Sequence, residues 1–350
     1  MVSNCEKLYV FNPDTDMALG SNCRNYTPPI NIQSFIRKLA LLPALYAQND
    51  SLILLPPGLN RLDSCNLIYY DIVKSKNIKL ITDEDLTKKY FHVIPWGWDE
   101  TLCNRLSRKG VIVADTQNNI LNFNEICSIR KALSHRRISI KIHKLLLQHL
   151  GDTGINIPIE FTDSNMAYDW ASNNLGCYLK SPWSSSGKGI FHCCESNKHL
   201  VEAWINATIK KQGSILAEVG ELRALDFATE WTVKDAKAQY EGLSVFKVNE
   251  HGNYQGNYLA SEKELTDIVA SYTDCFTPQL IDALRQTIDE LISPFYNGPL
   301  GVDMLVTKDG RLNPCVEVNL RNTMGHVALS LCKQGVKDEY FEPGKFVNFK

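Results

Sequence analysis

Two carboxylates and an amide near the C-terminus have the residue types of a metal site. The stretch from Gly301 to His326 reads GVDMLVTKDGRLNPCVEVNLRNTMGH, and apolar and polar residues alternate on both sides of Asp309-Gly310. Alternation with period two around such a pair is typical of a β-hairpin. Clustered carboxylate and amide oxygens are hard ligands that suit Mg²⁺. The length of the hairpin loop decides whether these oxygens meet.

Two loop lengths are compatible with the alternation, and they give opposite results. A two-residue loop would place Asp303 and Glu317 on opposite faces of the hairpin. A three-residue loop, with Gly310 left-handed at its third position, pairs Thr307 with Arg311. Because only this second register collects the apolar residues on one face, as a core requires, we predict the three-residue loop.

The three-residue loop makes a specific prediction about the candidate metal ligands. Asp303 then lies opposite Cys315, on the same face as Glu317 and Asn319. These three side chains would converge on one surface and form the predicted metal site. The alternative interpretation of an isolated hairpin is a polar face that simply contacts solvent.

A lysine and a run of small residues in the middle of the chain are suited to phosphate. Lys180 ends the strand-like segment CYLK, and a loop of small residues follows. The loop contains Ser184, Ser185, Ser186, Gly187, Lys188 and Gly189. Flexible backbone amides and hydroxyls around a lysine can cover phosphates, although the spacing is not that of a Walker loop. The alternatives are an ordinary turn and a lysine that reaches solvent along its stem.

A second strand-like segment, ILAEV, could hold a nucleotide base. Its last residues are Glu218 and Val219, and the segment FATEWTV follows shortly after. A strand that leaves this region could bind adenine through its exposed backbone edge, and Glu230 would then be a candidate ligand of the ribose hydroxyls. The alternative for both glutamates is an ordinary surface strand.

The elements that must position these residues begin with an α/β layer. Buried strands are predicted at Leu8–Phe11, Leu52–Leu55 and Lys79–Ile81, and apolar spacing predicts a helix over Ile32–Gln48. Strand, helix, strand in this order favours a parallel sheet, whose ligands collect at the carboxyl ends of the strands. The polar residues there are Asn12, Asp14 and Asp16. Substrate binding and turn capping are equally compatible with these aspartates.

Composition limits the classes of partner. The 350 residues are 44% hydrophobic and 22% charged with a net charge of −2, which is typical of globular proteins and gives no reason to expect nucleic acid or an anionic membrane as partner. No apolar run approaches the ~20 residues of a membrane helix. The eleven cysteines are scattered, so we expect reduced thiols and a cytoplasmic location. The stretch from Glu125 to Leu150 is predicted to be helical and basic.

The order of these signals resembles the ATP-grasp superfamily, which includes D-alanine–D-alanine ligase, glutathione synthetase and biotin carboxylase. A lysine strand with a Ser/Gly loop comes first, then a glutamate-bearing hinge, then Asp…Glu-x-Asn. The resemblance implies an α/β fold in three parts. These would be an N-terminal parallel layer over residues 1–124, a small lid lobe over 125–214, and a C-terminal lobe over 215–350 that carries the metal site, the last two with antiparallel sheets.

Position by position, the resemblance implies a role for each motif. Lys180 and the loop from Ser184 to Gly189 are similar to the strand lysine and mobile loop that contact the ATP phosphates. Glu218 and Val219 are similar to the adenine hinge, and Glu230 to the ribose ligand. The metal ligands would be Asp303, Glu317 and Asn319.

Two departures from the family pattern leave assignments open. The lysine that often begins a helix near ATP is not clearly placed, so Arg136 or Lys141 would replace it. The hinge is longer than usual, so the ribose ligand could instead be Glu221 or Asp226.

The resemblance implies a Mg-ATP-dependent ligase that activates a small carboxylate as an acylphosphate and transfers it to an amine or a thiol. Arg321, Lys188 and Lys180 would stabilise charge during phosphoryl transfer, with a pair of Mg²⁺ ions, or Mn²⁺, at the metal site. His326 would either take a proton from the amine or cap a helix. A peptide is among the candidate acceptors, and the sequence leaves the oligomeric state open. The competing interpretations are a phosphotransferase, a non-catalytic nucleotide binder, and an α/β binding module without ATP.

Overall fold

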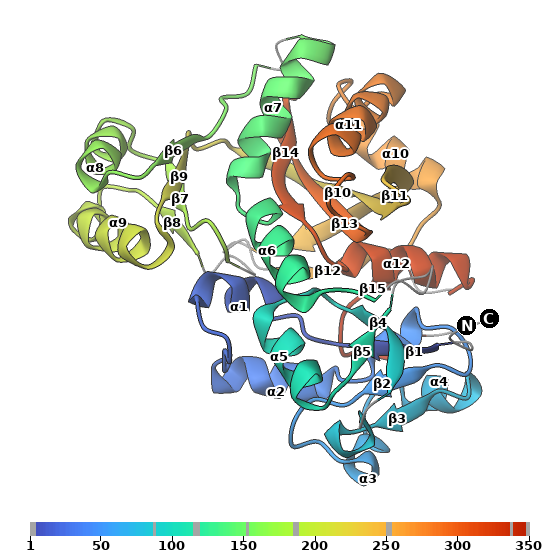
Figure 1. The fold of residues 1–350 in the computed structure, drawn as a ribbon. Helices are drawn as coiled ribbons and strands as arrows, with labels where there is room; N and C mark the ends of the chain where they lie inside the picture. Colours follow the sequence, from blue (N-terminus) through green and yellow to red (C-terminus); the bar gives the residue numbers. More distant parts are fainter. Residues whose placement is uncertain are drawn as a thin grey trace.

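The computed structural model places three lobes around a shared centre (Figure 1). It describes residues 5–86, 89–114, 120–151, 154–184, 189–249, 254–336 and 339–347. A parallel sheet forms the first lobe, a small antiparallel sheet the second, and a larger antiparallel sheet the third. Within these residues, no helix combines the length and the apolar composition that a membrane span needs.

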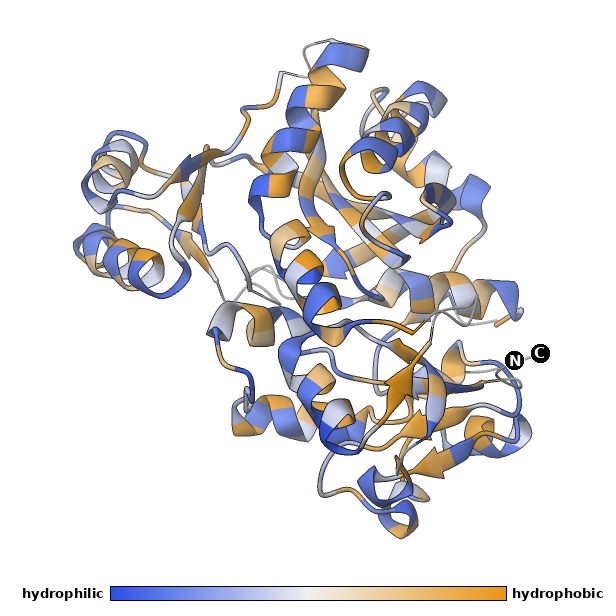
Figure 2. Ribbon diagram, viewed as in Figure 1, coloured by the Kyte–Doolittle hydropathy of each residue, from blue (hydrophilic) through white to orange (hydrophobic). Residues whose placement is uncertain are grey.

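The N-terminal lobe is built on a parallel sheet, as predicted, and this sheet has five strands. Its strands are β1 (Glu6–Val10), β2 (Leu52–Leu54), β3 (Lys79–Ile81), β4 (Tyr90–Pro95) and β5 (Ile112–Val113), in the order β3-β2-β1-β4-β5. Alternate residues of β1 enter different cores, Leu8 on one face and Tyr9 on the other, so both faces of the sheet are buried. β4 and β5, coloured hydrophobic in Figure 2, were not predicted from the sequence.

The strand order reverses between β1 and β4, and ligand crevices in open parallel sheets lie at such a point. The helices of this lobe are α1 (Thr15–Ser21), α2 (Ile30–Lys38), α3 (Arg61–Ser64), α4 (Tyr70–Ser75) and α5 (Glu100–Arg108), with 3₁₀ turns η1 (Leu42–Leu45) and η2 (Asp83–Leu86). The predicted helix over Ile32–Gln48 is therefore wrong in length. A separate 3₁₀ turn begins at Leu42, and its second residue, Pro43, cannot donate the hydrogen bond that a continuous helix would need.

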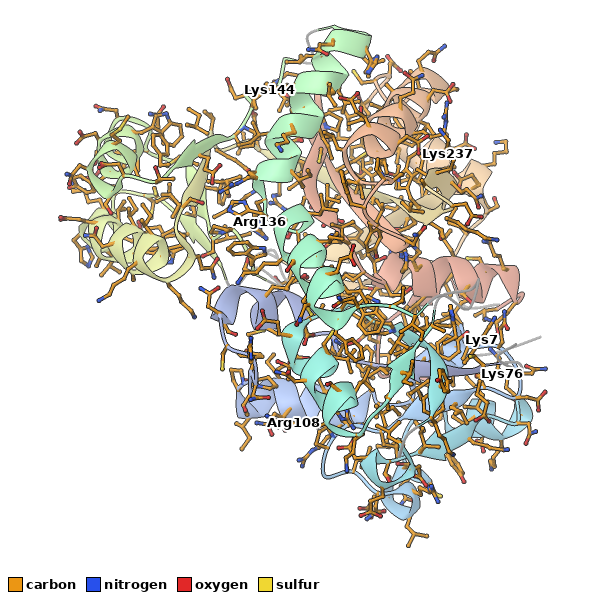
Figure 3. The ribbon with its side chains drawn as sticks, in the orientation of Figure 1. Lys7, Lys76, Arg108, Arg136, Lys144 and Lys237 are labelled. Carbon is orange, nitrogen blue, oxygen red and sulfur yellow. The ribbon has the colours of Figure 1, made fainter. Side chains whose placement is uncertain are left out.

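Two helices connect the N-terminal lobe to the others. They are α6 (Phe123–Leu133) and α7 (Arg137–Leu150), where a single basic helical stretch was predicted. α7 packs against the third lobe, and Ile138, Ile142 and Leu146 enter its core. The break between the two helices holds Arg136, which Figure 3 labels where they meet the lid lobe.

The lid lobe is a four-stranded antiparallel sheet with two helices. Its strands are β6 (Ile159–Phe161), β7 (Tyr178–Lys180), β8 (Ile190–His192) and β9 (Ile215–Glu218), in the order β6-β9-β7-β8. Its helices are α8 (Ser164–Asn173) and α9 (Lys198–Gln212). Ala167, Leu179 and Ile205 are fully buried between sheet and helices. The pairing of β9 with β7 fixes the distance between the two motifs that they carry.

The C-terminal lobe is a six-stranded antiparallel sheet. Its strands are β10 (Arg223–Lys234), β11 (Lys237–Val248), β12 (Tyr254–Tyr258), β13 (Gly298–Thr307), β14 (Leu312–Asn319) and β15 (Tyr340–Phe341), in the order β14-β13-β10-β11-β12-β15. Its helices are α10 (Glu262–Ala270), α11 (Pro278–Leu291) and α12 (Met324–Lys333). α11 packs with Phe227, Trp231 and Val302 in one core, whereas Val327 and Leu331 of α12 pack into the N-terminal lobe. α12 thus joins the two lobes.

Two elements pack with a different lobe from the one to which the proposed domain boundaries, at residues 124 and 214, assign them. α7 contributes to the core of the C-terminal lobe, although it was assigned to the lid. β9 pairs within the lid sheet, although residues from 215 onward were assigned to the C-terminal lobe. The three-part division stays a proposal, and this packing favours moving both elements across it.

Candidate functional site

The β13–β14 turn has the predicted three-residue loop. The amide of Thr307 donates to the carbonyl of Arg311 over 2.9 Å. Gly310 has a φ of +83°, the left-handed conformation that glycine adopts without strain. The register next to the turn is therefore confirmed.

Further from the turn the predicted register is wrong. Asp303 pairs with Glu317 and not with Cys315, because β14 contains extra residues in an irregularity between Asp303 and Leu305. Pro314 lies within the irregularity, and a proline has no amide hydrogen for the ladder. The shift is an even number of residues, so Asp303 and Glu317 still share a face. Cys315 instead turns into the core, where it is 1% exposed.

The three predicted metal ligands lie together on that face. Asp303 and Glu317 are directly opposite, and the amide of Asn319 donates to Oδ2 of Asp303 over 3.1 Å. Burial, followed by the charges of Glu317 and Glu230, raises the pKa of Asp303 to about 7. Across the described ranges, no group of three or more His, Cys, Asp or Glu side chains could hold a metal ion. The cluster of Asp303, Glu317 and Asn319 has only two acidic side chains, and its third donor is an amide.

Two arginines flank the cluster. Nη2 of Arg321 donates to Oδ1 of Asn319 over 2.7 Å, and Nη2 of Arg136 donates to Oε1 of Glu317 over 2.8 Å. Arg136 is 5% exposed, and within the part of the chain that the structure describes its Nε and Nη1 have no hydrogen-bond acceptor. Lys141, the alternative to Arg136, is exposed on α7. The geometry therefore favours Arg136 over Lys141 as the residue near the site.

Arg321 is also tied to the N-terminal lobe through Asp16. Oδ2 of Asp16 lies 2.6 Å from Nε of Arg321, and Oδ1 lies 2.9 Å from Nη2 of Arg130. Burial alone would raise the pKa of Asp16, but the two guanidinium groups together lower it below its ordinary value. Arg130 was not singled out from the sequence, since nothing distinguishes it from the other basic residues of its helix.

The lysine strand and the hinge are adjacent in the lid sheet. Nζ of Lys180 lies 2.5 Å from Oε2 of Glu218, and Lys180 is only 4% exposed. Val219 follows in the connection between β9 and β10 and is 42% exposed. Gly220 must be glycine, since a Cβ there would lie 2.0 Å from the carbonyl oxygen of Gly176. The hinge backbone is thus held close to the lid.

The ends of the predicted phosphate loop are close together. The amide of Ser181 donates to the carbonyl of Gly189 over 2.8 Å, and a Cβ on Gly189 would lie 2.3 Å from Cβ of Ser184. The hydroxyl of Ser184 is buried and has no hydrogen-bond partner in residues 154–184, 189–249 or the other described ranges. The remaining predicted residues of this loop, Ser185, Ser186, Gly187 and Lys188, lie outside the described residues.

Glu230 does not have the surroundings of a ribose ligand. It is 1% exposed, and its carboxylate accepts hydrogen bonds from Ser244 Oγ over 3.0 Å and Thr323 Oγ1 over 2.8 Å. A ribose would have to displace both contacts, so the geometry argues against this prediction. The surroundings of Glu230 depend on Thr323, which is distant in sequence, and no local pattern indicates this contact.

The two alternative ribose ligands differ in position. Oε2 of Glu221 lies 2.8 Å from Nη2 of Arg311. Asp226 lies on the same face of β10 as Ala228, which pairs with Asp303. Burial raises the pKa of Asp226, and Arg223 partly offsets this effect. Asp226 is therefore the alternative that shares the face of the metal cluster.

His326 has the capping role that was one of its two predicted roles. Its amide donates to Oγ1 of Thr323 over 3.1 Å, and its Nδ1 accepts from the Thr323 amide over 3.3 Å. Nδ1 also lies 3.1 Å from Oε2 of Glu230. These contacts form a capping box at the start of α12. A role in proton transfer stays a prediction.

Comparison with known proteins finds similarity in structure alone. No protein-family model and no curated protein matches the sequence. The biotin carboxylase domain of 2-oxoglutarate carboxylase from Hydrogenobacter thermophilus, solved with MgADP and bicarbonate, is 12% identical with a TM-score of 0.50, over 98% of this chain and 72% of that chain. Biotin carboxylase from Campylobacter jejuni, solved in a β,γ-ATP complex, is 11% identical with a TM-score of 0.50, over 95% of this chain and 69% of that chain.

Biotin carboxylase is one of the ATP-grasp proteins that the motif order resembles. The solved structures share with this chain the whole succession of lobes, since the matches cover nearly all of it. A parallel sheet followed by two antiparallel sheets is the arrangement expected from that resemblance. The chain therefore has the ATP-grasp fold.

Proposed function

We propose that the protein is a Mg-ATP-dependent ligase that activates a carboxylate as an acylphosphate and transfers it to an amine. One observation carries the proposal: the facing pair Asp303 and Glu317 lies between Arg136 and Arg321, and Arg136 has buried N–H groups that find no acceptor among the described residues. Carboxylates suit a cation and the unpaired N–H groups of a guanidinium suit an anion, and a metal–nucleotide complex satisfies both.

The donor set fits magnesium. Carboxylate oxygens from Asp303 and Glu317 and the amide oxygen of Asn319 are the ligand types that Mg²⁺ binds, together with water and phosphate oxygens. Bound there, Mg²⁺ would neutralise charge on the phosphate oxygens of ATP. Arg136 and Arg321 now hydrogen-bond to Glu317 and Asn319, so both guanidinium groups lie within reach of the same phosphates.

Three side chains would supply the contacts to phosphate, and these are Arg136, Ser184 and Lys180. Counting described residues alone, two nitrogens of Arg136 that bear N–H groups lack acceptors and the Ser184 hydroxyl lacks a partner. The amide of Arg136 donates to the carbonyl of Pro182 over 3.1 Å, which places the start of α7 beside this loop. Since leaving buried donors unpaired costs about 1–3 kcal/mol each, bound phosphate oxygens would stabilise this region. Lys180 would supply the third of these contacts and, like Arg136, would bring a positive charge.

Adenine would bind at the hinge. Val219 is 42% exposed between the lid sheet and β10, and Glu218 holds Lys180 beside it. For the ribose we favour Asp226 over Glu230, because both lie on the face of Asp303 but Glu230 is enclosed under α12.

The reaction follows from these contacts. The substrate carboxylate attacks the γ-phosphorus, ADP leaves, and the acylphosphate is then attacked by the amine, which releases phosphate. The first step needs no base because a carboxylate is already a nucleophile. Arg321 and Arg136 would stabilise charge on the transferred group, as would Lys188, which lies outside the described residues. His326 already caps α12, so the proposal assigns it no essential step.

Nucleotide binding is tested first. A ligand at 100 times its Kd stabilises the native state by about 2.7 kcal/mol, so Mg-ATP is expected to raise the melting temperature clearly. The absence of any shift at millimolar Mg-ATP would refute nucleotide binding and with it the proposed function.

Catalysis is tested by incubating the protein with ATP, pooled amino acids and small carboxylates, and by measuring the ADP and phosphate that are released. Glu317→Gln is expected to abolish turnover and to leave the fold intact, because it removes a charged metal ligand and preserves shape. The matched control is Glu202→Gln, the same exchange at an exposed position on α9. Undiminished turnover in Glu317→Gln would contradict the metal role, and binding without turnover in the wild type would favour the non-catalytic alternative.

A further inference from the structure

The segment that follows β14 fills the point where the N-terminal sheet reverses its strand order. The amide of Asn322 donates to the carbonyl of Trp96, just past β4, over 2.8 Å. A Cβ on Gly97 would lie 3.1 Å from Cβ of Arg321, so glycine there permits the close approach. The carboxyl ends of β1 and β4 are therefore adjacent to the strands β13 and β14 that carry the metal cluster.

All three nitrogens of the Arg321 guanidinium group are engaged. Nη2 donates to Asn319 Oδ1 over 2.7 Å and Nη1 to the Asn322 carbonyl over 3.1 Å, and both acceptors are neutral. Nε donates to Asp16 Oδ2 over 2.6 Å. In the part of the chain that the structure describes, Asp16 is the one carboxylate that is ion-paired with Arg321. The direction of the guanidinium group therefore depends on Asp16 more than on its neighbours.

Asp16 is itself fixed at its other oxygen. Oδ1 accepts from Nη2 of Arg130 over 2.9 Å, and Arg130 is 1% exposed. Asp16 lies in the first turn of α1 and is 7% exposed, so three elements (α1, α6 and the end of β14) meet at its carboxylate. A carboxylate held at both oxygens cannot swing away from Arg321 without breaking a second buried ion pair.

We infer that Asp16 is a positioning residue, which holds the Arg321 guanidinium group toward the phosphoryl group that is transferred. This inference rests on the proposed function. A charge-assisted bond from a fixed carboxylate restricts the rotation of the guanidinium group before ATP binds, so less ordering is needed when the transition state forms. The N-terminal lobe thereby takes part in phosphoryl transfer through Arg321 without contacting the nucleotide.

The test compares Asp16→Asn with Asp169→Asn, the same exchange at an exposed position on α8. No ion pair of Asp169 is found among the described residues, whereas Asp16 has two. The probes are Mg-ADP alone and Mg-ADP with aluminium fluoride, a mimic of the transferred phosphoryl group, with affinities measured by calorimetry. Asp16→Asn is expected to bind Mg-ADP within twofold of the wild type and to lose about tenfold or more in affinity for the aluminium fluoride complex. Asp169→Asn is expected to change neither affinity.

Two further variants separate positioning from folding. Asp16→Glu keeps the charge and is expected to recover part of the affinity for the aluminium fluoride complex, which a general loss of stability would not reproduce. The double variant Asp16→Asn/Arg321→Lys is expected to bind that complex as weakly as Arg321→Lys alone, because Asp16 acts through Arg321.

The results that overturn the inference are distinct from those that overturn the proposed function. A wild type that does not bind Mg-ADP would refute both. A wild type that binds the aluminium fluoride complex, together with an Asp16→Asn variant that binds it equally well, would refute the inference alone. Additive losses in the double variant would do the same. If Asp16→Asn does not fold, the test uses Asp16→Glu instead. The inference is then overturned if Asp16→Glu binds both probes as the wild type does, or if its effect adds to that of Arg321→Lys in the double variant.

Discussion

His135 gives the protein a pH-dependent stability that can be measured. It is 4% exposed in the break between α6 and α7, and its ring packs edge-on against Trp183 of the lid at a centroid distance of 4.7 Å. Its Nδ1 accepts the amide of Arg137 over 3.0 Å. Burial, followed by the charge of Arg137, lowers the pKa of His135 from 6.5 to about 4. The folded protein therefore holds this histidine neutral.

The sign and the size of the effect follow from the two pKa values. Above pH 6.5 neither the folded nor the unfolded chain protonates His135, so its full contribution to stability is present. As the pH falls from 6.5 toward 4, the unfolded chain gains a proton that the folded chain does not, and stability is lost. At 1.36 kcal/mol per pH unit of separation, the loss reaches about 2.5 kcal/mol at pH 4.5.

The assay is urea unfolding followed by tryptophan fluorescence between pH 7.5 and 4.5. Other groups titrate in this range, so the quantity of interest is the difference between the wild type and His135→Gln, which removes the titrating ring. That difference is expected to change by about 2.5 kcal/mol in favour of the variant as the pH falls. His199→Gln, at an exposed position on α9, is the control for loss of a histidine. Parallel stability curves for the wild type and His135→Gln would refute the reasoning.

Two further predictions concern stability without nucleotide, measured by urea unfolding. Lys180→Met is expected to cost about 3 kcal/mol, because it leaves Glu218, whose side chain is only 16% exposed, without its partner. Adding Glu218→Gln is expected to recover most of the loss, and a stable single variant would contradict the ion pair. Gly310→Ala is expected to cost about 1 kcal/mol from the left-handed backbone, with Lys308→Ala as control. The new Cβ would meet only the Tyr272 carbonyl, at 3.5 Å, so a much larger loss would mean that the turn is built differently.

The parts of the site that follow local rules were predictable. Alternation and the left-handed Gly310 are properties of a few neighbouring residues, and they identified the face that Asp303 and Glu317 share. The irregularity near Pro314 was not predicted, although a proline inside a strand pattern is a recognised signal for one. The parallel sheet was predicted from its buried strands, but β4 was missed.

The contacts between distant segments could not be predicted. The enclosure of Glu230 depends on Thr323, and the partner of Asp16 is 305 residues away. Such contacts are set by how complete lobes pack, and no spacing in the sequence encodes them. Arg136 lies in a break between two helices, where helical periodicity indicated one continuous helix. The direction of its side chain could therefore not be predicted either.

The separation between Asp16 and Arg321 also sets when the site can exist. Because the two residues are 305 positions apart and synthesis proceeds at 5–20 residues per second, Asp16 leaves the ribosome roughly 15–60 s before its partner. The strands of the parallel sheet lie within residues 6–113 and are complete long before β14 appears. The growing chain can therefore form the parallel sheet and the Asp16–Arg130 ion pair well before Arg321 and α12 complete the site. Ribosome-bound chains that end before Arg321 are accordingly expected to be inert toward ATP.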